Sequence, residues 1–126
     1  MLEIKPVEDK KKQEEICREC GAVFKEGAFA YSASENGKIL GVCQFGIVGE
    51  YGYVYDLKNA VGVDDFEALF LMGRAVLNFI DLCGTHKAIF TGDESAATKA
   101  VGFKNENGRL FMDLEGFFSN PCGHEK

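Results

Sequence analysis

The sequence predicts a single mixed α/β (α+β) domain, in which three helices flank a sheet of about six to seven strands. Three observations predict it. The chain has 126 residues, which is room for one domain of ordinary size. Its first half is rich in β-forming segments joined by tight turns, which is typical of antiparallel strands. Its second half contains a strongly periodic helix followed by a buried strand, and this connection usually joins parallel strands.

The first half predicts a strand, a helix and an antiparallel meander of three strands. The Asn36-Gly37 pair readily takes the positive φ angles of a tight hairpin turn, and residues 49–52 predict a second turn. The few apolar residues of the charged helix gather on one face, and Gly21 can end it. The strand, the helix and the three meander strands are expected over residues 2–7, 8–20, 28–34, 38–48 and 53–57.

The second half predicts a long helix, a buried strand, a short helix and a closing hairpin. Apolar residues recur at helical spacing in the long helix, where Asp64 or Asp65 can cap the first turn and Gly84 can end the last. Because the strand follows this helix, we expect it to pair in parallel with the last meander strand. The helix, strand, short helix and hairpin are expected over residues 64–83, 87–91, 93–100 and 103–114.

Composition argues against several classes of function. The formal charge is −6 and no basic stripe is interleaved with aromatic residues, so we expect no nucleic-acid partner. The N-terminus lacks an apolar stretch of signal-peptide or membrane-spanning length, so we expect a cytoplasmic protein with no membrane partner. The five cysteines are an odd number, and several lie in apolar periodic segments, which favours reduced thiols.

The order of these elements resembles that of the GNAT superfamily of acyltransferases over residues 1–114. Residues 37–41 (GKILG) look like the family's turn into its third strand, and residues 100–103 (AVGF) look like its Ala-rich helix ending in Gly-Phe. The resemblance implies a GNAT-like domain whose sheet splays between the strands at residues 53–57 and 87–91, with acetyl-CoA in the opening. Residues 115–126 form a tail that we expect to dock on the same domain, because Phe117 and Phe118 are costly to leave in water.

The loop that holds the cofactor in the family departs from its pattern here. In the family a glycine-rich loop with an Arg or Gln presents backbone N–H groups to pyrophosphate at the start of the long helix. The matching residues 64–69 (DDFEAL) contain three carboxylates and neither glycine nor a basic residue. The resemblance still implies that backbone groups of Leu57, Asn59 and Val61 hold pantetheine. Gly62 could allow the backbone a close approach to a ligand, although a plain loop glycine is the alternative. The basic residues near the cleft mouth that could meet phosphate, none of which replaces the loop Arg by position, are Lys58, Arg74, Lys87 and Lys99.

The catalytic groups must also differ from the family's pattern. The family's general-acid Tyr corresponds to Thr98, whose hydroxyl is a poor acid. Alternation places Tyr53 and Tyr55 on one strand face, where either could replace that acid, and places Asp56 on the opposite face. The Asp56 carboxylate, or Glu50 at the strand entrance, could take a proton from an amine. Packing aromatics and solvated carboxylates remain open as alternatives.

Two functions therefore fit the sequence. The first is acetyl-CoA-dependent N-acyl transfer to a small-molecule or peptide amine. The second is a catalytically inactive GNAT-fold domain that binds a small ligand or a protein, which explains the carboxylates at the long helix. Charge reversal at Lys58 should affect the function only if the protein is an acyltransferase. The exposed edge of a splayed sheet also favours a homodimer.

A metal site is a further alternative. Cys17 and Cys20 resemble half of a zinc knuckle, which Cys122 and His124 could complete if the tail folds back. Cys17 and Cys20 lie three residues apart in a predicted helix, however, where they would pack as small apolar residues. We therefore expect no metal.

Overall fold

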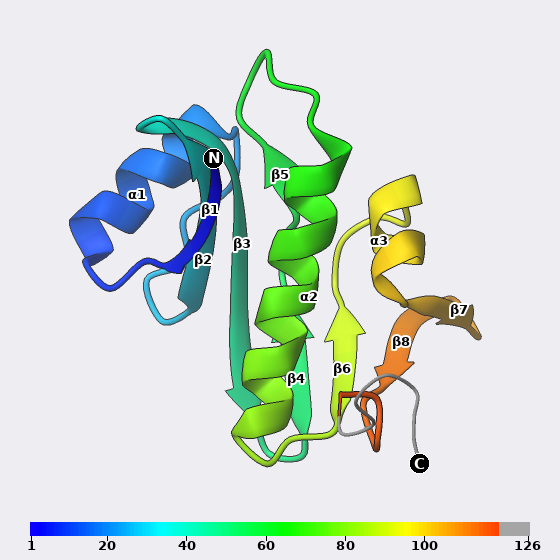
Figure 1. Cartoon of the computed structure of the whole chain (residues 1–126). Coiled ribbons are helices and arrows are strands. Elements are labelled where there is room, and N and C mark those ends of the chain that lie inside the picture. The colour runs from blue at the N-terminus through cyan, green and yellow to red at the C-terminus, as the bar shows by residue number, and fades with distance from the viewer. Residues whose placement is uncertain (119–126) are drawn as a thin grey trace.

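A single mixed sheet organises the computed structural model, which describes residues 1–118 (Figure 1). Within these residues the sheet has eight strands: seven follow the order β1-β2-β3-β4-β6-β8-β7, and the eighth, β5, pairs with β3. Among the described strands, only β4 and β6 pair in parallel, as the long helix between them predicts. The elements are β1 (Leu2–Pro6), α1 (Lys10–Glu19), β2 (Phe29–Glu35), β3 (Lys38–Val48), β4 (Tyr51–Val54), β5 (Lys58–Asn59), α2 (Phe66–Leu82), β6 (Lys87–Phe90), α3 (Ala96–Val101), β7 (Lys104–Glu106) and β8 (Arg109–Asp113).

The sheet divides the apolar core into two clusters, one on each face, and each cluster is covered by a helix. The larger cluster lies between the sheet and α2, whose Met72, Val76 and Ile80 are fully buried. The smaller one lies between α1 and β3, where Ile16 and Cys17 pack on Val42. Since α1 covers only the N-terminal side of the sheet, no helix of the described chain, residues 1–118, lies on the face of β4 and β6 opposite α2 (Figure 1).

Local sequence signals explain where the elements begin and end. Asn36 and Gly37 have φ angles of 53° and 80°, which confirms the tight turn between β2 and β3. Asp9, Asp65 and Ser95 each cap a helix by accepting a hydrogen bond from a backbone N–H of its first turn. The predicted order of elements is therefore confirmed.

The predicted third meander strand over residues 53–57 is wrong in its bounds. The turn after β3 is shorter than predicted, so Tyr51 and Gly52 already belong to β4, which ends at Val54. The chain returns to the sheet as β5, which pairs with β3 rather than extending β4. This division raises the number of strands above the six to seven expected.

Gly41 allows β5 to approach β3 closely. A Cβ atom at this position would lie 2.8 Å from the carbonyl oxygen of Lys58 and 3.3 Å from Cε of Met72. We expect Gly41→Ala to lower the free energy of unfolding by about 1–3 kcal/mol, because the backbone of β5 must shift. Gly27→Ala is the control, since its Cβ would meet nothing within 4 Å. Chemical denaturation measures both, and equal effects would contradict the prediction.

The described part of the tail contacts the domain. The Arg74 guanidinium lies 4.8 Å from the ring centroid of Phe70 and 5.0 Å from that of Phe117, and it donates to the carbonyl oxygen of Val101. Phe118 packs at the edge of the larger core cluster. Docking of the whole tail stays a prediction, because residues 119–126 lie outside the described residues.

Candidate functional site

A bulge between β4 and β5 shapes the site. Val54 pairs with Phe45, and Lys58 pairs with Val42, so two residues of β3 stand opposite three residues, 55–57. The extra residue breaks the alternation of side chains. Tyr55 and Asp56 therefore line the same pocket, which corrects the expectation that they occupy opposite faces.

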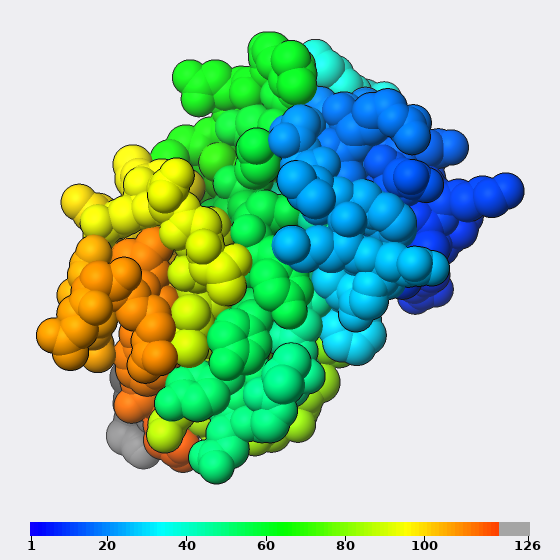
Figure 2. All heavy atoms as spheres, turned by 180° about the vertical axis from the view of Figure 1, so that it is seen from behind, coloured from blue at the N-terminus to red at the C-terminus, as the bar shows by residue number. Residues whose placement is uncertain are grey.

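The pocket lies where β4 and β6 separate, as the resemblance implies. The last ladder bond between them runs from the amide of Thr91 to the carbonyl oxygen of Val54. Beyond it opens a pocket of about 440 Å³. Figure 2 shows this face of the molecule, with the segment after α1 (light blue) and the segment after β6 (yellow) on either side of β4 (green). The lining residues are Gly21, Ala22, Val23, Lys25, Tyr55, Asp56, Leu57, Lys58, Phe90, Thr91, Gly92, Asp93 and Ser95.

Asp56 is bound to the sheet through Gln44 of β3. Its Oδ1 accepts a hydrogen bond from the backbone amide of Gln44 at 2.6 Å, and its Oδ2 accepts one from Nε2 of the same residue at 2.7 Å. The carboxylate thus takes the place that a backbone carbonyl oxygen would hold in an unbroken ladder. The two hydrogen bonds from Gln44 therefore account both for the bulge and for the orientation of the Asp56 side chain.

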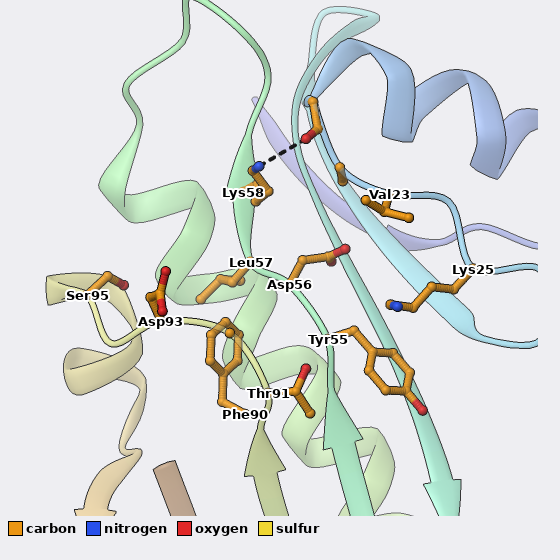
Figure 3. Close-up of a pocket in the computed structure, with 13 residues that line it drawn as sticks. Val23, Lys25, Tyr55, Asp56, Leu57, Lys58, Phe90, Thr91, Asp93 and Ser95 are labelled. Carbon is orange, nitrogen blue, oxygen red and sulfur yellow. Dashed lines mark hydrogen bonds between the residues drawn. The ribbon is translucent and has the colours of Figure 1, made fainter. Parts of the chain in front are cut away.

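Burial makes Asp56 easier to protonate than an ordinary carboxyl group. Desolvation raises its pKa above the ordinary 3.8, against the opposing effects of the hydrogen bonds from Gln44 and the charges of Lys58 and Lys25. Figure 3 shows Lys25 and Asp56 reaching into the pocket from different walls. A half-buried carboxylate with a raised pKa in a pocket is typical of a proton-transfer site.

Lys58 and Tyr55 occupy opposite ends of the pocket wall (Figure 3). The ammonium of Lys58 donates to the carbonyl oxygen of Gly21 at 3.0 Å, which ties β5 to the segment after α1. The Tyr55 hydroxyl lies against the backbone of β3, 3.0 Å from where a Cβ of Gly46 would stand. Tyr53 does not line the pocket, and its ring packs beside Tyr51 with centroids 6.2 Å apart.

Backbone donors are also available at the bulge. Within residues 1–118 the amides of Asp56 and Leu57 donate no hydrogen bond to the protein, although both residues line the pocket. Free amides beside a pocket can bind a carbonyl oxygen or an oxyanion.

The segment that leads into α2 is closed by its own side chains. The Asn59 side chain accepts from the amide of Asp65 and donates to its carbonyl oxygen, and the Asp65 carboxylate accepts from the amide of Ala68. The amide of Val61 donates to the carbonyl oxygen of Glu19. Asn59, Val61 and Gly62 do not line the pocket. Of the predicted site residues, the pocket brings together Tyr55, Asp56, Leu57 and Lys58.

Thr98 is occupied by helix capping. It is buried, and its hydroxyl forms a capping box with Ser95 at the start of α3.

The zinc alternative receives no support from the described cysteines. Cys17 of α1 and Cys20, the residue that ends this helix, are buried, and burial raises their pKa values to about 11 and about 12, which disfavours the thiolates that bind zinc. No group of three potential metal ligands occurs within residues 1–118. Cys122 and His124 lie outside the described residues.

Sequence reasoning missed Gln44 and the loop residues of the pocket. Gln44 is the polar residue within an apolar run of β3, and such a residue needs buried hydrogen-bond partners. This signal was present in the sequence. The loop residues Val23, Lys25 and Asp93 carry no such pattern, because only the fold brings their loops together.

Comparisons with known proteins place this geometry in a known fold. No protein-family model matches the sequence, and no curated protein matches it either. The ribosomal-protein-S18-alanine N-acetyltransferase from Escherichia coli matches with a TM-score of 0.70 at 12% identity, over 90% of this chain and 94% of its own. The IAA acetyltransferase from Bacillus cereus gives 0.72 at 16% identity, over 90% and 100%.

A third structure, a GNAT family acetyltransferase from Brucella melitensis in complex with acetyl-CoA, gives a TM-score of 0.67 at 14% identity, over 90% of this chain and 88% of its own. No helix within residues 1–118 has the length and apolar character needed to cross a membrane. The chain has the fold of the GNAT acetyltransferases.

Proposed function

We propose that this chain is an N-acyltransferase that transfers an acyl group from a thioester to an amine in the pocket between β4 and β6. One observation carries the proposal: the half-buried carboxylate of Asp56 lines a pocket at the bulge, where the amides of Asp56 and Leu57 donate to no acceptor within residues 1–118. These are the two elements that aminolysis of a thioester needs, namely a proton acceptor and hydrogen-bond donors for the carbonyl oxygen.

The residues present fit the thioester end of an acyl-CoA. The free amides of Asp56 and Leu57 would hold the acyl carbonyl, and the apolar Leu57 and Phe90 flank the opening. When bound, the donor supplies an acyl carbon activated towards nucleophiles.

The residues at the start of α2 do not fit the pyrophosphate of CoA. Asp65 caps this helix itself, and Asp64 and Glu67 add negative charge to a helix end that otherwise attracts anions. No basic side chain takes the place of the family's Arg or Gln in residues 64–69. We therefore propose that the donor binds through its acyl and pantetheine parts, and that the ADP part contributes little.

Asp56 would act as the general base. An amine is nucleophilic only after it loses its proton, and a carboxylate at hydrogen-bond distance can accept that proton directly or through a water molecule. Because the pKa of Asp56 is raised, its basicity is higher than that of an exposed aspartate. The base is active when deprotonated, so the rate should rise with pH through the pKa of Asp56.

The second candidate is a domain of the same fold that binds a ligand without catalysis. The self-capped, acidic start of α2 favours it, because a domain without a nucleotide cofactor has no use for a phosphate cradle there.

The test is to mix the full chain with acetyl-CoA or with acetyl-pantetheine and a panel of primary amines, and to measure release of thiol. Calorimetry with each thioester runs beside it. Thiol release that needs both amine and protein supports the proposal. Binding of either thioester without thiol release would favour the second candidate. Neither binding nor release would overturn acyl transfer from these donors.

A further inference from the structure

A chain of buried side-chain amides runs from the pocket into the molecule. Gln44 is fully buried and Gln13 of α1 is 1% exposed. The side-chain oxygen of Gln44 accepts from Nε2 of Gln13 and from the amide of Lys25, both at 2.9 Å. Its Nε2 donates to the carbonyl oxygen of Val23 at 2.8 Å and to Oδ2 of Asp56 at 2.7 Å. Every donor and acceptor direction of this amide is therefore used.

Further hydrogen bonds fix the orientation of the Gln13 side-chain amide. The ammonium of Lys10 donates to the side-chain oxygen of Gln13 at 3.1 Å and also to the carbonyl oxygen of Ala28. The Nε2 of Gln13 also reaches the carbonyl oxygen of Lys25, at 3.3 Å. Since Lys10 can only donate, the oxygen of Gln13 must face it, and Nε2 must face Gln44.

The orientation of the Gln13 amide fixes that of Gln44, and Gln44 in turn orients the Asp56 carboxylate. Because the oxygen of Gln44 receives two donors, its Nε2 can only point towards Val23 and Asp56. The amide cannot flip without setting donor against donor. Gln44 thus holds each oxygen of Asp56 with one hydrogen bond, one from its backbone and one from its side chain.

We infer that Gln44 is a positioning residue for Asp56, and that Gln13 keeps Gln44 in the orientation this requires. The inference rests on the function proposed above. Two bonds from one rigid strand hold the carboxylate in one rotamer, while each oxygen keeps a further lone pair for the pocket. Gln44 is fully buried and does not line the pocket, so it would act only through Asp56.

Other titratable groups also face Asp56, and they are common to every variant below. Lys58 reaches it from β5 and Lys25 from the segment after α1. Three buried thiols lie within electrostatic reach of Asp56, and they are neutral near pH 7 because burial raises their pKa values; they are Cys17, Cys20 and Cys43.

The test replaces the amide by a carboxyl group of the same shape. In Gln44→Glu one oxygen still accepts from Gln13 and Lys25, but the other must carry a proton to face Asp56. Two carboxyl groups that share a proton titrate at a raised apparent pKa. We expect the acidic limb of the kcat/KM profile to move up by at least about one pH unit. The carbon-13 titration of the Asp56 carboxyl should move in the same direction.

Val76→Ala is the control, because it opens a cavity under α2 on the opposite face of the sheet and changes no charge. It should lower stability and leave both titrations in place. If Gln44→Glu reduces activity while both titrations stay where they are in the wild type, Gln44 has only a structural role and the inference is overturned.

The inference and the proposed function can fail separately. If the wild type releases no thiol at any pH, acyl transfer fails, and the carbon-13 titration of Asp56 still decides the role of Gln44. If Gln44→Glu does not fold, Gln13→Met replaces it. This change leaves both bonds to Asp56 but removes one of the two donors that fix the oxygen of Gln44, and a smaller upward shift of the Asp56 titration is expected. No shift would overturn the inference.

Discussion

Replacing Asp56 by Asn should lower kcat/KM for acyl transfer about 10²- to 10⁴-fold, the usual contribution of a positioned general base. The Asn side chain has nearly the same shape but cannot accept the proton of the incoming amine. Its oxygen can still accept one of the two bonds from Gln44. The loss should therefore appear mainly in kcat, and the acidic limb of the pH profile should disappear. Steady-state kinetics with saturating thioester measures both.

Glu50→Gln is the matched control, because it neutralises the other carboxylate considered as a base. Glu50 is exposed in the turn between β3 and β4 and does not line the pocket. We expect activity within about a factor of two of the wild type, as for a surface substitution. A larger loss in this variant than in Asp56→Asn would contradict the assignment of the base.

Asp56 should also make the stability of the protein depend on pH. The folded-state pKa of Asp56 is raised above the ordinary 3.8, so folding takes up a proton between these two pKa values. Its contribution to stability is therefore largest at low pH and is lost as pH rises from 3.8 through the folded-state pKa. Denaturant unfolding at a series of pH values should show a smaller fall in this window for Asp56→Asn than for the wild type. Identical slopes would contradict the raised pKa.

The acidic start of α2 should make the protein nearly indifferent to the ADP part of a thioester donor. We expect similar kcat/KM values for acetyl-CoA and acetyl-pantetheine. Replacing Asp64 and Glu67 together by Asn and Gln should improve kcat/KM for acetyl-CoA about 2- to 30-fold, since each repulsion between an exposed carboxylate and the diphosphate costs about 0.2–1 kcal/mol.

Acetyl-pantetheine is the internal control, because it lacks the diphosphate that these carboxylates would repel. Its kinetics should be unchanged by the double substitution. A wild type that strongly prefers acetyl-CoA would show that the diphosphate has a binding site elsewhere on the molecule. Equal gains for both donors would show that the substitutions act on the fold rather than on the charge.

The sequence predicts the fold more completely than it predicts the site. The period of residues 64–83 and the Asn36-Gly37 turn depend on local physics, and both are confirmed. The bulge after Val54 depends on Gln44, ten residues earlier, whose amide bonds to the Asp56 carboxylate replace a ladder bond. Strict alternation therefore gave the wrong face for Asp56. The loop carrying Lys25 meets the pocket only through tertiary contacts, which no local pattern encodes.

The eleven-residue β3 bonds to β2 along one edge and to β4 and β5 along the other. A strand bonded on both sides exchanges its amide protons slowly, because freeing them requires an opening of high free energy. In hydrogen-exchange experiments, the amides of β3 should thus be among the slowest in the chain. Those of Asp56 and Leu57 should exchange fast, since no acceptor within residues 1–118 protects them. The amides best protected from exchange and those least protected would thus lie opposite each other at the bulge. A ligand could then reach the free amides of the site while β3, which supports the site, keeps its hydrogen bonds.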